Sequence, residues 1–483
     1  MTGDSTSDLL AALRRIVGDE RCLSREEEVF VYECDGLTLE RATPAAVVFP
    51  VSPHEVQQLV RACREHQRPF VPRGAGTGLS GGATALAGGV VIECSRLNRI
   101  REIDAGNRIA LVEPGVVNAD LSKAVASFGL YYAPDPSSQL ACTIGGNIAE
   151  NSGGPHTLKY GTTTNHVRAL EVVLPDGELV QLGSRAGIAD GYDLVGAFVG
   201  SEGTLGIVTA ACVNLEPIPE GVETLLGIFP DVVSACRAVG GIIDAGLVPA
   251  ALEIVDRRTI EAVEASVYAA GLPRDAGAVL IVELDGLRVT LPRQVARVRE
   301  IAAQAGAARV EIARDASERQ RFWRARKGAF GAMGRLAPDL YVHDAVVPRS
   351  VLPEVLAAVC EIGDRHRIKL SNVFHAGDGN LHPNISFDRR DADERRRVEA
   401  AGAEILELCV RAGGVITGEH GIGTEKRDYM RLLFGEDDLD AMRRLRAAFD
   451  PEGVCNPGKL LPTPHFCAEA NPRARGYDAV PIE

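Results

Sequence analysis

The sequence has no cysteine pair in a C-x-x-C arrangement and no run of lysine and arginine residues long enough to argue for a basic patch. Its eleven cysteines are scattered and odd in number, a pattern typical of buried thiols in a reduced chain rather than of a disulfide framework, a zinc ribbon or an iron–sulfur site. Acidic residues outnumber basic ones by 66 to 52, and the formal net charge of −14 disfavours binding to nucleic acid. We therefore expect free thiols and no nucleic-acid partner.

Long apolar runs are also missing. No window reaches the ~18 consecutive apolar residues that a membrane-spanning helix needs, and residues 1–18 contain no apolar stretch of the kind found in secretory signals. These absences predict a cytoplasmic protein without a direct membrane span. With 46% hydrophobic and 24% charged residues over 483 positions, the chain is expected to form two or three globular domains.

The stretch 1–220 alternates short strands with helices. Ser52 and Glu55 form a capping box at the start of a helix, and the apolar residues that follow recur at helical spacing. Strands are expected at 45–50, 69–72 and 90–94.

A different pattern follows a boundary rich in proline and glycine at 217–221. Helices expected at 231–246 and 290–306 alternate with strands at 223–229 and 278–284, as in an α+β domain with an antiparallel sheet. Farther on, the pattern reads helix, strand, hairpin, helix, strand. We predict an α+β fold with units at 1–220 and 221–425 and a C-terminal return segment at 426–483.

The densest glycine cluster is R-G-A-G-T-G-L-S-G-G at 73–82. It satisfies G-x-G-x-x-G, the Rossmann dinucleotide fingerprint, but that fingerprint needs a helix to start inside the motif. The next strand begins at Val90 and leaves no room for such a helix, so the Rossmann interpretation fails. A bare loop with exposed N–H groups and the hydroxyls of Thr77 and Ser80 can instead bind phosphate, and a flexible turn is the alternative.

Two further segments have the same character. One runs from P-D-P-S-S to T-I-G-G-N-I-A-E-N-S-G-G over 134–154, and the other is G-S-E-G-T-L-G-I-V-T at 200–209. Each alone could be a loop rich in turns. Together with the first glycine cluster they could line an elongated phosphate-bearing ligand such as a dinucleotide.

Histidines cluster in the last third of the chain. Residues 371–387 read as strand, Gly-Asp-Gly turn and strand, and closure over 376–381 would place His375 opposite His382 on one face. A strand expected at 415–417 leads into a tight loop with Glu419 and His420. Two histidines and one carboxylate suit zinc, iron or manganese, and separate polar residues with local partners are the alternative.

A basic helix that holds the only tryptophan reads F-W-R-A-R-K at 322–327. An arginine is the best-shaped cation for a carboxylate. A solvated basic face is the alternative, and we favour it for Arg324 and Lys327.

The three glycine-rich segments together resemble the FAD-binding domain of the vanillyl-alcohol oxidase / p-cresol methylhydroxylase flavoprotein family. The motifs H-x-G-D-G-N-x-H at 375–382 and G-E-H-G at 418–421 are similar to those of its FAD-linked 2-hydroxy-acid dehydrogenases, in particular the glycolate oxidase group. The resemblance spans about residues 40–462. It implies an FAD-binding domain at 1–220 and a cap domain with the metal and catalytic motifs at 221–425.

The resemblance implies bound FAD. No His or Cys lies in the first glycine loop, so non-covalent FAD is expected, and His156 and Cys142 are the other places where a covalent link would be sought. The residues implied to bind the cofactor are Arg73, Gly74, Gly76, Thr77, Gly78, Ser80, Gly81, Gly82, Pro134, Asp135, Thr143, Gly145, Gly146, Asn147, Asn151, Gly153, Gly203, Gly206, Ile207, Val208 and Asn456.

The same resemblance implies a divalent metal, Zn, Fe or Mn, held by His375, His382 and Glu419. His420 would be the catalytic base and Arg326 would bind the substrate carboxylate. A lysine found near the substrate in relatives that act on dicarboxylates is missing from 341–344, which favours a small monocarboxylate such as glycolate or D-lactate.

Finally, the resemblance implies hydride transfer to flavin N5 and partner proteins that take up the electrons. These would be a second flavin-fold subunit and an iron–sulfur subunit feeding a quinone at the inner face of the membrane. A stand-alone dehydrogenase with a diffusible acceptor stays open. So do a D-lactate or D-2-hydroxyglutarate dehydrogenase, a non-redox flavoenzyme such as an alkyl-glycerone-phosphate synthase, and a non-enzymatic binding subunit.

Overall fold

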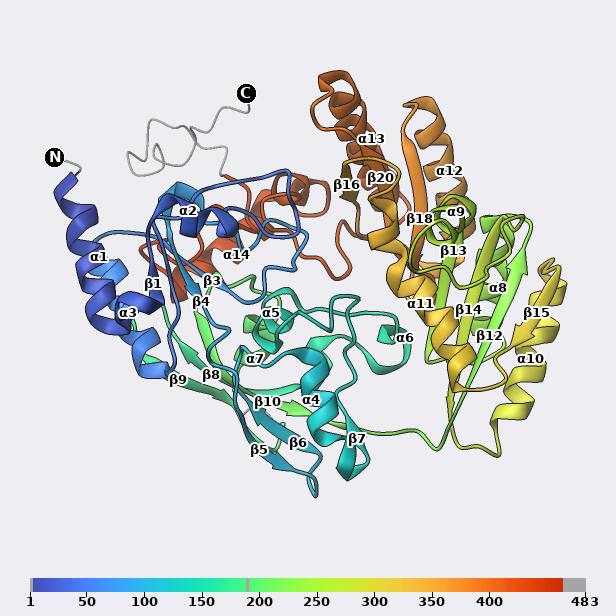
Figure 1. Ribbon diagram of the computed structural model, residues 1–483, viewed down its shortest axis with the longest axis horizontal. Coiled ribbons are helices and arrows are strands. Elements are labelled where there is room, and N and C mark those ends of the chain that lie inside the picture. Colours follow the sequence, from blue (N-terminus) through green and yellow to red (C-terminus); the bar gives the residue numbers. More distant parts are fainter. Residues whose placement is uncertain (1–2, 188–190, 464–483) are drawn as a thin grey trace.

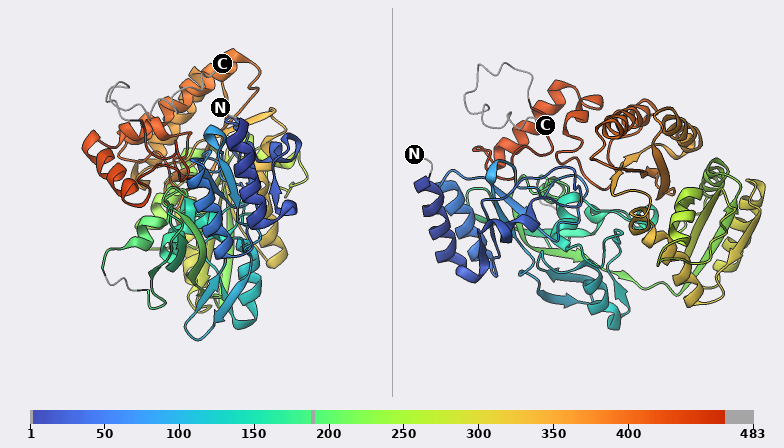
Figure 2. Two further views of the ribbon diagram at one scale, coloured as in Figure 1. Left: turned by 90° about the vertical axis from the view of Figure 1, so that its left-hand side faces the viewer. Right: turned by 45° about the horizontal axis from the view of Figure 1, so that its top comes forward.

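The computed structural model describes residues 3–187 and 191–463. Its elements form two bodies, with the first half of the chain on the left of Figure 1 and a large sheet with its helices on the right. The last helix, α14 (Glu436–Phe449), returns to the first body. A second view shows the same arrangement (Figure 2).

The first sheet has the strand order β1-β2-β4-β3, in which β2, β4 and β3 are parallel. Helix α3 (Pro53–Glu65) covers it and begins as predicted, because Ser52 accepts a hydrogen bond from the Glu55 amide. Between β3 and β4 the described chain forms only a 3₁₀ turn at Leu86–Gly88, so the rejection of a Rossmann crossover helix is confirmed. The strands of this sheet are β1 (Cys22–Leu23), β2 (Ala46–Val48), β3 (Phe70–Arg73) and β4 (Val90–Glu93).

The second sheet is antiparallel, in the order β5-β6-β10-β8-β9. A buried apolar core joins it to the helices α4 (Asn118–Val125), α5 (Ile144–Glu150) and α7 (Leu194–Phe198). The segment that follows Thr143 is thus a short helix rather than a loop, because the Thr143 side chain accepts a hydrogen bond from the Gly146 amide and caps it. The strands are β5 (Ile100–Asp104), β6 (Ile109–Val112), β8 (Val167–Val173), β9 (Leu179–Gly183) and β10 (Ile207–Asn214).

The third sheet has nine strands, seven of which follow the order β15-β12-β14-β13-β18-β19-β17. Helices α8 (Val232–Asp244), α10 (Leu291–Gln304), α12 (Leu352–Arg365) and α13 (Ala392–Arg411) share one core with it, and α9 (Arg257–Glu264) and α11 (Ala316–Met333) share the other. The expected antiparallel α+β arrangement is confirmed. The strands are β12 (Gly221–Phe229), β13 (Ala251–Asp256), β14 (Ala278–Gly286), β15 (Arg309–Ile312), β16 (Asp339–Val342), β17 (Ala345–Val346), β18 (Lys369–His375), β19 (Asn380–Leu381) and β20 (Pro383–Phe387).

Two local predictions on this sheet are wrong. His375 pairs with Asn380 rather than with His382, because the hairpin closes over the shorter loop 376–379, in which Gly379 adopts a φ of 82°. The strand expected at 415–417 is a single bridge between Val415 and Val346, because the amides that follow bond to a buried carboxylate instead of a neighbouring strand.

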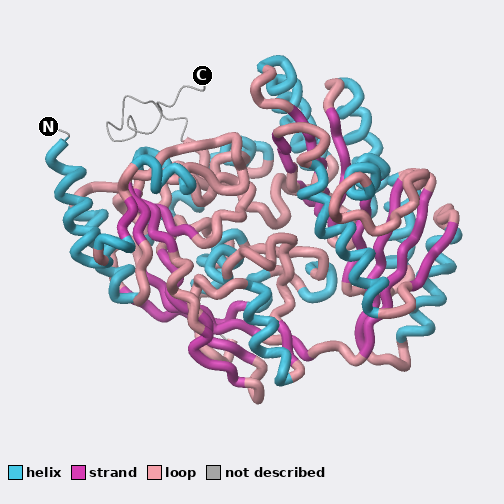
Figure 3. Tube along the Cα trace, in the orientation of Figure 1, coloured by secondary structure: helices cyan, strands magenta, loops and turns pink. Residues whose placement is uncertain are grey.

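The centre of the molecule consists mainly of loops, as Figure 3 shows. The C-terminal segment enters this region after α14, where Cys455 forms a parallel bridge with Phe70 of the first sheet. None of the described helices combines the length and apolarity needed to cross a bilayer.

Candidate active site

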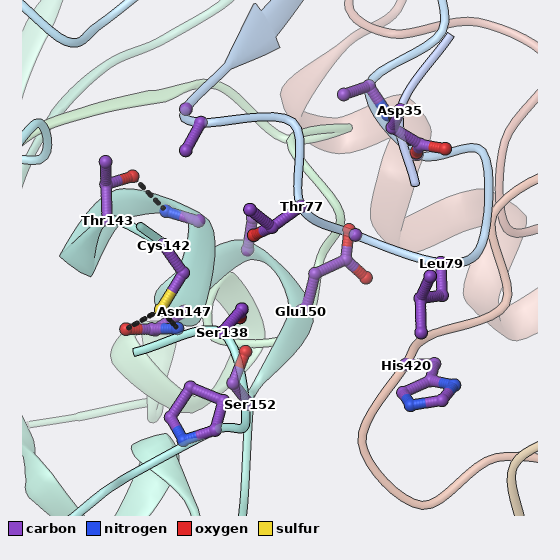
Figure 4. A pocket seen from close by; sticks show the side chains of 18 of the residues that line it. Asp35, Thr77, Leu79, Ser138, Cys142, Thr143, Asn147, Glu150, Ser152 and His420 are labelled. Carbon is purple, nitrogen blue, oxygen red and sulfur yellow. Dashed lines mark hydrogen bonds between the residues drawn. The ribbon is translucent and has the colours of Figure 1, made fainter. Parts of the chain in front are cut away.

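A cavity of about 450 Å³ lies among the central loops and is lined by residues from both bodies. In Figure 4, Thr143 and Asn147 mark one side and His420 the other, with Thr77 and Glu150 between them. One cavity therefore reaches from the glycine loop to the histidine cluster. The predicted cofactor residues that line the cavity are Arg73, Gly74, Gly76, Thr77, Gly78, Gly82, Thr143, Gly145, Gly146, Asn147, Gly203, Gly206, Ile207 and Val208.

The glycine loop is built so that the backbone itself forms this wall. A Cβ on Gly74 would lie 2.4 Å from Oγ1 of Thr143, and Gly76 has a φ of 67°, which side-chain-bearing residues rarely adopt. Glycine at these positions therefore lets the loop pack closely against Thr143 and Arg73 while its backbone borders the cavity. The N–H groups of the loop and the Thr77 hydroxyl are donors that fit the phosphates of FAD.

Seven predicted cofactor residues do not line the cavity. Asn456, for example, donates to the carbonyls of Gly82 and Glu202 and so supports the wall from behind. His156 does not line the cavity either, whereas Cys142 does. The seven residues are Ser80, Gly81, Pro134, Asp135, Asn151, Gly153 and Asn456.

The sequence did not indicate a role for two carboxylates in the cavity wall, Glu202 and Glu150. Glu202 accepts hydrogen bonds from the amides of Ile422 and Gly423, both at 2.6 Å, and so ties the loop after His420 to the first body. Glu150 is its neighbour, and burial together with the Glu202 charge holds the pKa of Glu150 well above its ordinary value. Glu202 lies within the G-S-E-G motif, which was read for its glycines alone.

His375, His382 and Glu419 converge on one point. The Nε2 atoms of both histidines lie 3.2 Å from Oε1 of Glu419, and the two rings stand edge to face with centroids 5.1 Å apart. One ligand atom from each of the three lies within 4.8 Å of those of the others. The rings meet despite the shifted hairpin register because the pair Asn372–Pro383 places His382 diagonally to His375.

Each ring has a separate partner at Nδ1, so the Nε2 atoms that face Glu419 are the ones that would bind a metal placed there. Nδ1 of His382 lies 3.3 Å from the carbonyl oxygen of His343, and Nδ1 of His375 lies 2.7 Å from Oε1 of Glu253. A carbonyl or carboxylate only accepts, so each Nδ1 donates its proton, and each Nε2 would present its lone pair to a metal bound between the rings and Glu419. This donor set fits a divalent cation with open positions.

The loop with Glu419 and His420 is held by Asp344, which is fully buried. The Asp344 carboxylate accepts from the Thr417 hydroxyl and from the amides of Gly418, Glu419 and His420, and the Lys426 ammonium lies 3.4 Å away. A second set of possible ligands, Asp344 with His382 and His420, is less suited to a metal because these donors occupy the carboxylate.

His420 stacks on His382, with ring centroids 4.9 Å apart and planes at 8°, and it lines the cavity. Its Nε2 is 4.0 Å from Glu419, so it stands beside the ligand cluster. Burial lowers the pKa of His420 to about 4, which keeps the ring neutral at pH 7 and able to accept a proton.

Of the five basic residues on α11, only Arg326 is buried. It lines the cavity, and its Nε donates to Oε2 of Glu253 at 2.5 Å. Arg324 is exposed and donates to the Ala269 carbonyl, as expected for a solvated face. Lys327 is exposed as well, as expected, and it borders the cavity 3.8 Å from Asp135.

His156 connects the two bodies. Its Nδ1 lies 2.9 Å from Asp135, its Nε2 lies 3.0 Å from Glu283 of β14, and its ring stacks on Trp323. With both nitrogens engaged and the ring outside the cavity, His156 is poorly placed for a covalent flavin link. Although burial opposes it, the Asp135 and Glu283 carboxylates raise the pKa of His156 to about 10.

Replacing His156 with glutamine is expected to lower Tm by several degrees at pH 7 and to have less effect at pH 10.5. The folded-state pKa lies above the ordinary value of 6.5, so the stabilisation is complete below pH 6.5 and is lost as the pH rises through about 10. Thermal unfolding followed by circular dichroism between pH 6.5 and 10.5 measures this. An equal Tm gap at both ends would contradict it, and the exposed His54→Gln serves as control.

Comparisons with known proteins agree with this geometry. A family model described as FAD binding domain matches residues 44–183, and one described as FAD linked oxidases, C-terminal domain, matches residues 218–460. The chain belongs to the FAD-linked oxidases.

Relatives of this FAD-linked oxidase are similar over nearly their whole length. The glycolate oxidase subunit GlcD of Escherichia coli is 47% identical over 466 residues, which cover 96% of this chain and 93% of the relative. The mitochondrial D-lactate dehydrogenase [cytochrome] of Arabidopsis thaliana is 31% identical over 465 residues, covering 95% and 81%. The predicted family membership is confirmed.

Solved structures show the same fold. A p-cresol methylhydroxylase with substrate bound superposes with a TM-score of 0.82 at 18% identity and covers 95% of this chain and 97% of that one. An alkyldihydroxyacetonephosphate synthase superposes with a TM-score of 0.74 at 18% identity, covering 93% and 84%. At this identity the likeness establishes the fold alone, since the two neighbours have different activities by name.

Proposed function

We propose that this flavoenzyme oxidises a small 2-hydroxy acid, glycolate or D-lactate, to the 2-oxo acid. The observation that carries the proposal is that one cavity joins the glycine-rich walls to the His375, His382 and Glu419 cluster and to buried Arg326. The relatives named for glycolate and D-lactate support this substrate class.

Two groups would supply chemistry that the side chains lack. The glycine-rich walls would hold FAD non-covalently, and FAD would supply the acceptor for the hydride of the α-carbon. His375, His382 and Glu419 would hold a divalent metal (Zn, Fe or Mn), which would supply the Lewis acidity that lowers the pKa of the substrate hydroxyl.

The chain's own residues bind and orient the substrate between these groups. Arg326 presents its guanidinium to the cavity and binds the substrate carboxylate. His420 is neutral and unprotonated on its free nitrogen, so it accepts the hydroxyl proton. Val342 and Val373 add apolar side chains to the cavity wall, which suits a short carbon chain better than a second carboxylate.

The same hypothesis assigns a function to each segment of the chain. Residues 1–220 bind FAD, 221–425 bind substrate and metal, and 426–483 return to the first unit; the part of the last segment beyond residue 463 lies outside the described residues. The E. coli relative is named a subunit, so we infer that partners carry the electrons onward, a second flavin-fold subunit and an iron–sulfur subunit. The protein would then be cytoplasmic, at the inner face of the membrane through those partners.

Anaerobic titration of the flavin-loaded protein with glycolate, D-lactate, L-lactate and D-2-hydroxyglutarate tests the proposal. We expect glycolate or D-lactate to bleach the flavin band near ~450 nm, because two electrons enter the flavin for each substrate oxidised. Bleaching by D-2-hydroxyglutarate alone would move the assignment to a dicarboxylate. A flavin that none of these acids reduces would contradict the proposal and favour the non-redox alternative.

A further inference from the structure

Glu253 is a buried carboxylate that contacts two functional side chains at once. It lies on β13, is fully buried and stays outside the cavity lining. Its Oε1 is 2.7 Å from Nδ1 of His375, and its Oε2 is 2.5 Å from Nε of Arg326. One carboxylate therefore holds a candidate metal ligand and the candidate substrate-binding arginine from behind.

The backbone fixes this arrangement. Strands β13 and β18 are antiparallel with Glu253 directly opposite His375, so the two side chains share one face of the sheet. Arg326 reaches the same face from the long helix α11, which packs on that sheet. The three groups come from regular elements, and Arg326 Nη2 lies within 3.4 Å of His375 Nδ1. A shift of any one of them displaces the others.

Each contact of Glu253 changes what its partner can do. The bond to Nδ1 fixes the tautomer of His375 and makes its Nε2 a better electron-pair donor to a metal. The bond to Nε of Arg326 fixes the guanidinium at that edge and, with Nη2 beside His375, leaves Nη1 for a carboxylate in the cavity. Replacing the carboxylate by an amide removes one of the two acceptors, because an amide has a single oxygen and its NH₂ only donates.

We propose that Glu253 is a positioning residue that couples metal binding at His375 to substrate-carboxylate binding at Arg326. This inference rests on the proposed function. It implies that the metal and the substrate each increase the affinity of the other, and that a change at Glu253 weakens both. A salt bridge that only stabilises the fold would leave both affinities unchanged.

The test is Glu253→Gln in the flavin-loaded protein. We expect its affinity for Zn²⁺ and Mn²⁺, measured by competition with a chromophoric chelator, to fall roughly 10- to 100-fold. The KM for the hydroxy acid that bleaches the wild-type flavin should rise about tenfold, the effect of losing one charge-assisted hydrogen bond. Glu253→Asp keeps the charge but is too short to reach both partners, so it should show the same two losses if the glutamine variant does not fold.

Glu283→Gln is the matched control, because Glu283 is a buried carboxylate on the adjacent strand β14 that binds His156 and Trp323 and lies outside the cavity lining. Its metal affinity should equal that of the wild type. Wild-type metal affinity in Glu253→Gln, or an equal loss in Glu283→Gln, would overturn the coupling while leaving the metal site standing. A wild-type protein that binds neither metal would overturn the proposed metal site and the coupling with it.

Discussion

Replacing His382 with glutamine is expected to abolish metal binding and to lower kcat by at least roughly 10³-fold, since a metal that polarises the substrate oxygen contributes several kcal/mol to catalysis. The Nε2 of His382 points at Oε1 of Glu419 from 3.2 Å, and its Nδ1 is committed to a carbonyl. Glutamine offers a metal only a weakly binding amide in place of the Nε2 lone pair of His382. Metal content by elemental analysis and rapid-reaction reduction of the flavin measure the two effects.

The control is His166→Gln, because His166 is equally buried but its Nε2 lies 2.8 Å from the Tyr160 carbonyl and it is outside the cavity lining. This variant should keep its metal. Treating the wild-type protein with a chelator should reproduce the His382→Gln rate, and returning Zn²⁺ or Mn²⁺ should restore activity. Full activity in the chelated protein, or in a metal-free His382→Gln, would show that the cluster is not a catalytic metal site.

The parts of this fold that the sequence predicted are those set by local chemistry. The Ser52 cap places the start of α3 as predicted, although the Glu55 carboxylate accepts from the Val51 amide rather than completing the capping box. Glycines too numerous for a crossover helix exclude a Rossmann unit between Arg73 and Val90. The H-x-G-D-G-N-x-H motif gave the two histidines that the structure brings together, although the predicted partner of His375 was two residues away from the observed one, Asn380. A hairpin's register depends on the turn, and Gly379 allows a shorter one than the motif suggests.

The residues that sequence reasoning missed act across long separations. Glu253 meets a histidine 122 positions away, and Glu202 binds amides 220 positions away. Only the pairing of β13 with β18 reveals the first contact, and no periodicity in either strand encodes that pairing. A weak signal existed in both cases. A charged residue inside the apolar strand A-L-E-I-V-D must find a buried partner. An acidic residue among the glycines of a cofactor-binding loop has few ways to place its carboxylate in solvent, so it must find one as well.

Replacing His420 with glutamine is expected to lower kcat roughly 10²- to 10⁴-fold while metal content and KM stay near those of the wild type. His420 stacks on His382 and faces the cavity, but its Nε2 is 4.0 Å from Glu419, so removal of the ring should cost a proton acceptor rather than a ligand. Because glutamine cannot accept the proton at neutral pH, the loss should appear in the rate of flavin reduction.

Comparing His382→Gln with His420→Gln separates the roles of the two histidines, because the rings are stacked but only His382 points at the proposed metal position. His382→Gln should lose metal and rate together, and His420→Gln should lose rate alone. Metal loss in His420→Gln would instead favour the alternative ligand set with Asp344, and the acceptor of the hydroxyl proton would have to be sought elsewhere. An unchanged rate of flavin reduction would remove His420 from the mechanism. Among the described residues, His420 is the half-buried, neutral histidine that lines the cavity beside the cluster of His375, His382 and Glu419.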